Sequence, residues 1–215
     1  LWSREKRVAT QKELLEKYPG TLICFMLNIP GPEKVNELFE KVFYEGLEKI
    51  QNKLETEKIS TEVRLVQENI TGYEGYLVVK ADGCQVKKLM IALEETKIGS
   101  QYDLDVLEKE NTKISRKDLG FPERKCLLCD NPACQCGRSR KHSIEELRKK
   151  IYGIIWEEQL QRGVAAEISQ ALMEEVYTTP KPGLVDREDT GAHTDMNCQT
   201  FQKSTEAIAE DLAAM

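Results

Sequence analysis

The chain has 215 residues, a mass of 24.6 kDa and a formal net charge of −6, and 40% of its residues are hydrophobic. This length suits one domain of ordinary size with about a quarter more, or two small domains, and the hydrophobic content excludes a fully disordered chain or a fibrous repeat. The 37 acidic residues outnumber the 31 basic ones, which disfavours a duplex nucleic acid as partner, because such partners select clustered positive charge.

The apolar runs, the first residues and the cysteines indicate in which cellular compartment the protein works. No run approaches the roughly 18 apolar residues that cross a bilayer, and the opening LWSREKRVATQ lacks the apolar region of a signal peptide. We therefore expect a cytoplasmic protein with no membrane partner. The seven cysteines are an odd number, and a reducing cytosol disfavours disulfides. Four of them fall within residues 126–136, which suggests metal binding.

The first quarter of the chain predicts a helix, a strand and a second helix. Residues 3–17 are charged nearly throughout with apolar residues at helical spacing, and Pro19-Gly20 ends this helix. The apolar run over 21–29 predicts a buried strand, and NIPGPEK over 28–34 predicts a turn. Apolar residues three or four apart over 33–54 predict a long amphipathic helix.

The next sixty residues complete the predicted sheet. Residues 60–70 and 76–81 form a hairpin across Thr71-Gly72, a helix follows over 83–97, and period-2 alternation over 102–107 predicts a strand. We expect an α+β fold in which helices pack on a small mixed β-sheet, with strands near residues 21–28, 61–70, 76–81 and 102–108.

The remaining chain is less regular. Hydrophobic periodicity is lost over 111–140, a segment that needs a local staple or packing against the domain. Ser143 and Glu146 have the spacing of a capping box at the start of another helix. A polar loop over 178–198 and a final helix over 200–215 complete the predicted elements.

Asp103 and Asp105 are the strongest catalytic candidates. Residues i and i+2 of a strand point to the same face, so both carboxylates converge while Leu104 and Val106 face the core. Two carboxylates suit Mg²⁺, which combines them with waters and substrate phosphates and serves phosphoryl or nucleotidyl transfer. The alternative is a solvated strand face with no catalytic role.

A second constellation combines cysteines with a histidine. Cys126 and Cys129 have the C-x2-C spacing, Cys134 and Cys136 follow, and His142 comes six residues later. Such a set can hold a tetrahedral Zn²⁺ ion and so keep the irregular segment folded, with the choice of third cysteine open. The alternative is that these are small buried residues with free thiols.

Two further patterns carry charge. Arg138, Arg140 and Lys141 form a local basic patch that suits a polyphosphate, or else a solvated charge run. The proline-stiffened segment TTPKPGLVD and the following GAHTDM are typical either of a functional loop or of a linker, and their polar candidates are Lys181, Asp186, His193 and Asp195.

Taken in order, four motifs resemble the apo-citrate lyase phosphoribosyl-dephospho-CoA transferase family, also called holo-citrate lyase synthase. They are SREKRVATQKELLEKY, LNIPGPEK, YDLDV and RKCLLCDNPACQCGRSRKH, and the resemblance covers residues 3–158. TPKPGLVD and GAHTDM are similar to the start of the triphosphoribosyl-dephospho-CoA synthase family, as in a bifunctional fusion. We expect a transferase domain over 1–159 and the N-terminal part of a helical synthase domain over 160–215, without the second activity.

The resemblance implies a specific reaction. The family transfers the 2'-(5''-phosphoribosyl)-3'-dephospho-CoA group from its triphosphate precursor to a serine of the acyl carrier (gamma) subunit of citrate lyase, and pyrophosphate leaves. On this basis Asp103 and Asp105 would bind Mg²⁺ and align the α-phosphate for in-line attack by the carrier serine.

The resemblance also suggests binding residues. Candidates for the phosphates or the dephospho-CoA end are Arg4, Arg7, Lys34, Arg138 and Arg140, while Asn28 and Gly31 would shape a turn that lets backbone approach the ligand. Ser100 stands where the family pattern has an arginine, which removes an expected phosphate contact. The family pattern of three cysteines and one histidine makes Cys126, Cys129, Cys136 and His142 the preferred zinc set.

Alternatives to this function remain open at the level of sequence. One is the equivalent transferase for the malonate decarboxylase carrier, and another is a non-catalytic zinc-stapled module that docks a carrier protein. The sequence also leaves the third magnesium ligand open, with Glu94 and Glu95 as candidates at the end of the helix before the acidic strand.

Overall fold

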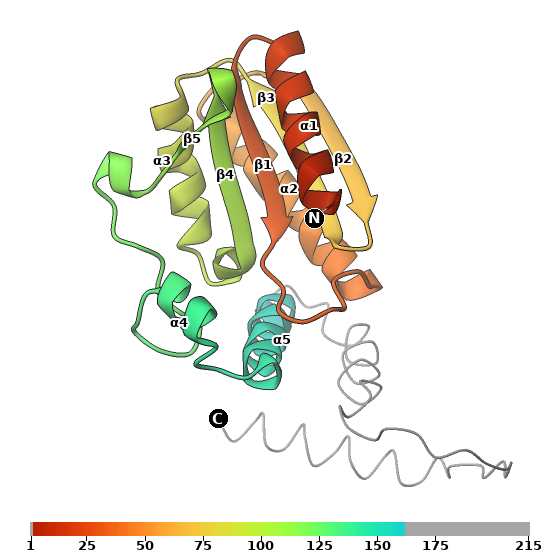
Figure 1. The fold of residues 1–215 in the computed structure, drawn as a ribbon, viewed down its shortest axis with the longest axis vertical. Coiled ribbons are helices and arrows are strands. Elements are labelled where there is room, and N and C mark those ends of the chain that lie inside the picture. Colours follow the sequence, from red (N-terminus) through yellow and green to blue (C-terminus); the bar gives the residue numbers. More distant parts are fainter. Residues whose placement is uncertain (1, 162–215) are drawn as a thin grey trace, which may run out of the picture. The chain divides into compact units, whose positions relative to one another are not determined.

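A five-stranded antiparallel sheet forms the centre of the fold in the computed structural model, which describes residues 2–161 (Figure 1). The strand order is β2-β3-β1-β4-β5, and every neighbouring pair is antiparallel. The elements, in chain order, are α1 (Trp2–Lys17), β1 (Thr21–Leu27), α2 (Glu37–Thr56), β2 (Thr61–Asn69), β3 (Gly72–Val79), α3 (Gly83–Glu94), β4 (Tyr102–Glu108), β5 (Thr112–Ile114), α4 (Ala133–Ser139) and α5 (Ile144–Gln161).

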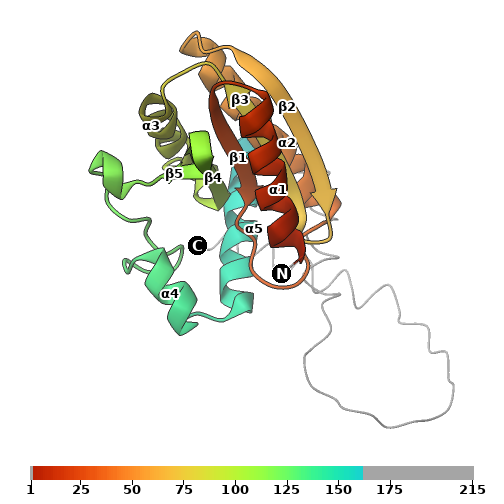
Figure 2. The same ribbon diagram turned by 45° about the horizontal axis from the view of Figure 1, so that its top comes forward.

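The two faces of the sheet are covered unequally. Figures 1 and 2 show α1 alone on one face and α2 and α3 on the other. On the α2 face, Phe25 of β1 stacks on Phe43 at 4.9 Å between ring centroids and meets the ring of Tyr102 edge-on. Gly46 permits this close approach, because a Cβ there would lie 2.6 Å from Cζ of Phe25. The larger core therefore lies beneath α2.

The α1 face has a smaller core. Leu14 of α1 packs in a cluster with buried side chains of three strands. They are Leu22 and Cys24 of β1, Tyr76 and Val78 of β3, and Leu107 of β4. Leu22, Val78 and Leu107 lie toward the end of the sheet where α1 ends and β1 begins, and Cys24 and Tyr76 lie opposite each other near the middle of their strands. Asp103 and Asp105, both half-buried, are on this face.

The predicted α+β class is confirmed, but the sheet is antiparallel throughout rather than mixed. The β1–α2–β2 and β3–α3–β4 connections each bring two strands into the same direction, as a helical crossover does. In both cases another strand is inserted between the two, β3 in the first and β1 in the second. Parallel strands are therefore present, and none of them are neighbours.

Differences from the predicted elements are local. The hairpin strand begins at Gly72 rather than at residue 76, because it pairs with β2 directly after the turn, from Asn69 opposite Gly72. The segment without periodicity contains the short β5 and the seven-residue α4. The capping box is confirmed, since the Glu146 amide donates to Oγ of Ser143 (3.1 Å) and the Ser143 amide donates to Oε2 of Glu146 (2.9 Å).

The predicted loop over 178–198 and helix over 200–215 lie outside the described residues. The boundary between residues 159 and 160 stays a prediction. Within residues 2–161, no helix combines the length and the apolar character that crossing a membrane requires.

Candidate functional site

The acidic pair, Asp103 and Asp105, lies on β4 as the strand pattern predicts. Asp103 is opposite Met26 and Asp105 is opposite Cys24 in the neighbouring β1, so both carboxylates are on the α1 face. Leu104 between them is fully buried on the other face. The pair therefore combines a rigid backbone with access to solvent, the arrangement that a metal-assisted transfer site needs.

The electrostatics of the pair favour a cation. Partial burial, and then the negative charge of Asp105, raise the pKa of the Asp103 carboxyl, while Lys113 and Arg124 oppose this rise. Nζ of Lys113 in β5 lies 2.5 Å from Oδ1 of Asp105 and forms a salt bridge with it. A divalent cation would relieve the repulsion between the two carboxylates, because opposite charge favours their ionised forms.

Glu74 is a third carboxylate on this face that the sequence analysis did not identify. It is opposite Met26 on β3, so the row Glu74–Met26–Asp103 crosses three strands. Its Oε1 accepts hydrogen bonds from Nε (2.9 Å) and Nη2 (2.8 Å) of Arg7, and its Oε2 accepts one from the Tyr76 hydroxyl (2.7 Å). Glu74 thus holds Arg7 at the site, and an acidic residue inside the apolar run GYEGYLVV was the available signal.

Neither suggested third magnesium ligand joins the pair. Glu94 is buried, and its oxygens accept hydrogen bonds from the backbone of Leu104 (3.1 Å) and from Nη2 of Arg116 (2.8 Å). Glu95 is exposed at the end of α3 and approaches the same arginine. In the described part of the chain, these carboxylates and the acidic pair form no cluster of three or more potential metal ligands.

Some of the predicted binding residues gather at the end of the sheet where Asp103 lies. The N-terminal end of α1, with the exposed Arg4 and the Glu74-bound Arg7, lies beside the end of β1 (Figure 1). Asn28, directly after β1, donates its backbone N–H to the carbonyl of Gln101 (2.7 Å), directly before β4. Arg4, Arg7, Asn28 and Asp103 therefore lie toward the same end of the sheet, and Asp105 is two residues farther along β4.

The other predicted binding residues lie elsewhere. Gly31 has φ +90°, and a Cβ there would lie 3.2 Å from Cγ2 of Ile144, so the turn packs against α5. Lys34 is beside the β2–β3 turn, with its Cβ 3.8 Å from the position of a Cβ at Gly72. Arg138 and Arg140 are exposed on α4 and at its end. Their place at a substrate stays a prediction.

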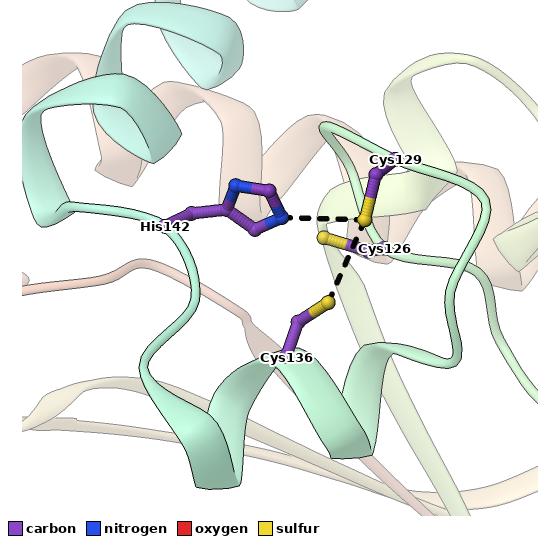
Figure 3. A group of neighbouring side chains, drawn as sticks. All are labelled: Cys126, Cys129, Cys136 and His142. Atoms are coloured by element: carbon purple, nitrogen blue, oxygen red, sulfur yellow. Dashed lines mark hydrogen bonds between the residues drawn. The ribbon is translucent and has the colours of Figure 1, made fainter.

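The second candidate site is the cysteine–histidine cluster, Cys126, Cys129, Cys136 and His142. Their potential ligand atoms all lie within 4.8 Å of one another. Sγ of Cys129 is 3.6 Å from Sγ of Cys136 and 3.3 Å from Nε2 of His142 (Figure 3). Cys134 is exposed, and its Sγ approaches Oε2 of Glu123 instead (3.6 Å). The tertiary structure thus selects Cys136 from the two cysteines that the spacing left open.

The protonation of the cluster fits a metal site. The backbone N–H of Asn131, followed by His142, lowers the pKa of the Cys129 thiol to about 6. Burial, and then the neighbouring Cys129 and Cys126, raise the pKa of Cys136 to about 11. Crowded thiols of this kind ionise together only around a cation, and three sulfurs with one imidazole nitrogen match a closed structural zinc site.

A cavity of about 1350 Å³ adjoins both the cluster and the start of β4. Its lining includes Cys136, His142 and Arg140 on the cluster side, and Asn28, Ser100 and Arg124 on the sheet side. Lys150 of α5 also lines it, and within residues 2–161 neither Lys150 nor Arg140 forms a salt bridge. The cavity is large enough for a nucleotide and presents cations to it.

The candidates from the proline-stiffened loop, Lys181, Asp186, His193 and Asp195, lie outside the described residues.

Two family models match this chain in succession. The model for apo-citrate lyase phosphoribosyl-dephospho-CoA transferase matches residues 1–158, and the model for ATP:dephospho-CoA triphosphoribosyl transferase matches residues 161–215.

Similar proteins follow the same division. A protein named CitXG from Haemophilus influenzae is 34% identical over 203 residues, which cover 94% of this chain and 44% of that protein. Another CitXG, from Leuconostoc mesenteroides subsp. cremoris, is 32% identical and is covered to 46%. A probable apo-citrate lyase phosphoribosyl-dephospho-CoA transferase from Streptococcus pyogenes is 42% identical over 70% of this chain and 80% of that protein. The chain therefore spans less than half the length of the two-part relatives.

Proposed function

The chain belongs to the apo-citrate lyase phosphoribosyl-dephospho-CoA transferase family, and we propose that it transfers the 2'-(5''-phosphoribosyl)-3'-dephospho-CoA group to the acyl carrier (gamma) subunit of citrate lyase. The donor is the triphosphate precursor and the acceptor is a serine of the apo carrier. The serine oxygen forms a bond to the α-phosphorus, the bond from this phosphorus to the bridging oxygen breaks, and pyrophosphate leaves. The serine proton passes to solvent or to a base.

The observation that carries this proposal is the acidic pair on one face of β4. Asp103 and Asp105 are half-buried and point to the same face of the sheet, the face on which Glu74 holds Arg7. Their carboxylates would hold Mg²⁺, which, when bound, neutralises charge on the transferred phosphate and on pyrophosphate. The rigid strand keeps both carboxylates in place, so little reorganisation accompanies the reaction.

Basic residues on two sides of the acidic pair support a polyanionic donor. Arg7 is held by Glu74 and Arg4 lies one turn earlier in α1, while Arg140 and Lys150 line the cavity near the start of β4. Guanidinium groups bind phosphate in a planar, bidentate manner. We propose that Arg4 and Arg7 bind the triphosphate and that the cavity holds the dephospho-CoA end.

The cysteine–histidine cluster has a structural role in this proposal. Zn²⁺ held by Cys126, Cys129, Cys136 and His142 would tie the loop, α4 and the start of α5 together, because a closed set of four ligands leaves no position for substrate.

The proposal is tested with the protein, the triphosphate precursor, Mg²⁺ and the purified apo carrier. Intact mass spectrometry should show the carrier gaining the mass of the phosphoribosyl-dephospho-CoA group, and pyrophosphate should appear in equal amount. Asp103→Asn and Asp105→Asn should each slow the gain by about 10²–10³-fold, whereas Glu68→Gln, an exposed acid-to-amide change on β2, should leave its rate unchanged. No mass gain with the wild type would refute the function, and an undiminished gain with both Asp variants would refute the role of the pair.

The same assay separates the alternatives. Replacing the citrate lyase carrier by the malonate decarboxylase carrier should remove the mass gain, and a preference for the latter would reassign the substrate. Capture of the carrier without pyrophosphate release would instead indicate a non-catalytic docking module.

A further inference from the structure

Within residues 2–161, no strand pairs with the outer edge of β4 beside the acidic pair. On its inner edge, β4 pairs with β1 from Tyr102 opposite Leu27 to Leu107 opposite Leu22. On the other edge, β5 pairs only with residues 106–108. Backbone groups at residues 102–105 on this edge therefore need other partners, because unpaired buried N–H and C=O groups are costly.

Charged side chains replace the missing strand. The ammonium of Lys87 donates a hydrogen bond to the Leu104 carbonyl (2.6 Å), and the Leu104 amide donates to Oε1 of Glu94 (3.1 Å). Arg124 donates through Nη1 to the carbonyl of Tyr102 (2.8 Å) and through Nη2 to that of Ser100 (2.9 Å). The residues on both sides of Asp103 are thus held by side chains from outside the sheet.

The burial of these charges shows how closely they fit. Lys87 is 4% exposed and Glu94 is 6% exposed, a degree of burial that is rare for lysine and glutamate without partners. Glu94 also accepts two hydrogen bonds from Arg116, at 2.8 and 3.2 Å, and Nη1 of Arg124 lies 3.6 Å from its other oxygen. The four side chains form one connected network along the edge.

Arg124 connects this network to the cysteine–histidine cluster. It is two residues before Cys126, and its backbone carbonyl accepts a hydrogen bond from the amide of Ala133 at the start of α4 (2.8 Å). Lys125 and Pro132 form a β-bridge in the same loop. The loop that positions Cys126 and Cys129 therefore also positions the Arg124 guanidinium, which donates hydrogen bonds to the backbone at the start of β4.

We propose that Arg124 is a positioning residue through which the metal-loaded cysteine–histidine cluster keeps the Asp103 segment of β4 in its binding geometry. The guanidinium spans the carbonyls of Ser100 and Tyr102 only while the loop is ordered. The contribution of Arg124 to catalysis rests on the proposed function. The coupling between the cysteine–histidine cluster and residues 100–105 can be measured without carrier or precursor.

Hydrogen–deuterium exchange of the zinc-loaded protein tests the coupling. In Arg124→Gln, amides of residues 100–105 should exchange about tenfold faster, while those of the β2–β3 hairpin stay as in the wild type. Removing zinc from the wild type with a chelator should give the same local change. Lys125→Gln, an exposed neighbour in the same loop, should change nothing. Equal exchange at residues 100–105 in wild type, Arg124→Gln and the zinc-free protein would overturn the proposal.

A second variant distinguishes a local effect on β4 from unfolding of the whole domain. If Arg124→Gln also loses protection in the hairpin, Arg124→Lys is used, because one ammonium can still serve one of the two carbonyls. Exchange at residues 100–105 should then lie between the wild type and the zinc-free protein, and wild-type rates would again overturn the proposal.

Binding of Mn²⁺ as a probe gives an independent readout. Titration followed by electron paramagnetic resonance should show a site that Asp103→Asn removes and that Arg124→Gln weakens about tenfold, an effect of misplacement rather than of lost ligands. Equal affinity in Arg124→Gln and the wild type would overturn the proposal. A wild type that binds no Mn²⁺ would contradict the metal role of the acidic pair instead, and the exchange measurements would then decide the coupling.

Discussion

The acidic pair and the cysteine–histidine cluster reach their geometry by different routes. Asp103 and Asp105 are two residues apart on a strand, so the pleat alone puts them on one face, and the ladder with β1 holds them there. The four cluster residues span 126–142 and come from a loop, a seven-residue helix and a linker. A strand site is organised before its ligand binds, whereas a loop site depends on its ligand for order.

The largest expected effect is a loss of transferase activity in a variant of the acidic pair that keeps its fold. Asp103→Asn should lower transferase activity by about 10²–10³-fold, because one of two charged groups that stabilise the transition state is lost. The urea midpoint should stay at or above that of the wild type, since the substitution removes a half-buried charge whose pKa is already raised. A fall in activity that only follows unfolding would contradict the idea of a preorganised strand site.

The reverse pattern is expected for the cluster. Cys136→Ser should lower the zinc content from about one ion per chain to a small fraction, measured by elemental analysis, because a closed site needs all four ligands. Exchange protection should fall over residues 124–142 and remain in β1 and β3. Cys134→Ser is the matched control, because this exposed thiol lies outside the cluster, and it should keep its zinc. Equal zinc loss in both variants would mean that the cluster is assigned wrongly.

The pH dependence sharpens the description of the acidic pair. Because the pKa of Asp103 is raised, the acid limb of kcat/KM should lie above the ordinary value of 3.8, and activity should be lost as pH falls through it. Lys113 lowers this pKa, so Lys113→Gln should move the limb to higher pH. Lys109→Gln, an exposed lysine just before β5, is the control. A limb that stays in place in Lys113→Gln would assign it to another group.

The smallest expected effect is on the helix that follows the cluster. Ser143→Ala removes the hydrogen bond to the Glu146 amide and should lower the free energy of unfolding by about 1 kcal/mol, measured by urea denaturation. Zinc content should stay at the wild-type level, because His142 is fixed by its ligand rather than by the cap. Zinc loss in this variant would show that order in the cluster depends on α5.

Much of the sheet and of the acidic pair was predictable because these features follow from local periodicity. The alternation around Leu104, the stripe of α2 and the capping box at Ser143 depend on neighbours within a few residues, and the structure has all three. The sequence does not point to Glu74, because the strand predicted from it begins only at residue 76 and leaves this carboxylate, which lies opposite Met26, outside the sheet. The pairing register with the neighbouring strand decides whether a residue near a strand end belongs to the sheet and which face it is on.

The length of the chain beyond one ordinary domain is accounted for by two successive family matches, at residues 1–158 and 161–215. The sequence by itself determined the order of helices and strands, the shared face of Asp103 and Asp105 and the set of cysteines near His142, since each is a matter of spacing along the chain. The spacing left Cys134 and Cys136 open, the family resemblance preferred Cys136, and the structure confirms that its sulfur joins the cluster. Only the tertiary structure decided that Glu94 holds the backbone of Leu104 and that Arg124 links the two sites. These contacts join segments 10 or more residues apart, or depend on which way a short helix turns its side chains, and spacing along the chain does not specify either.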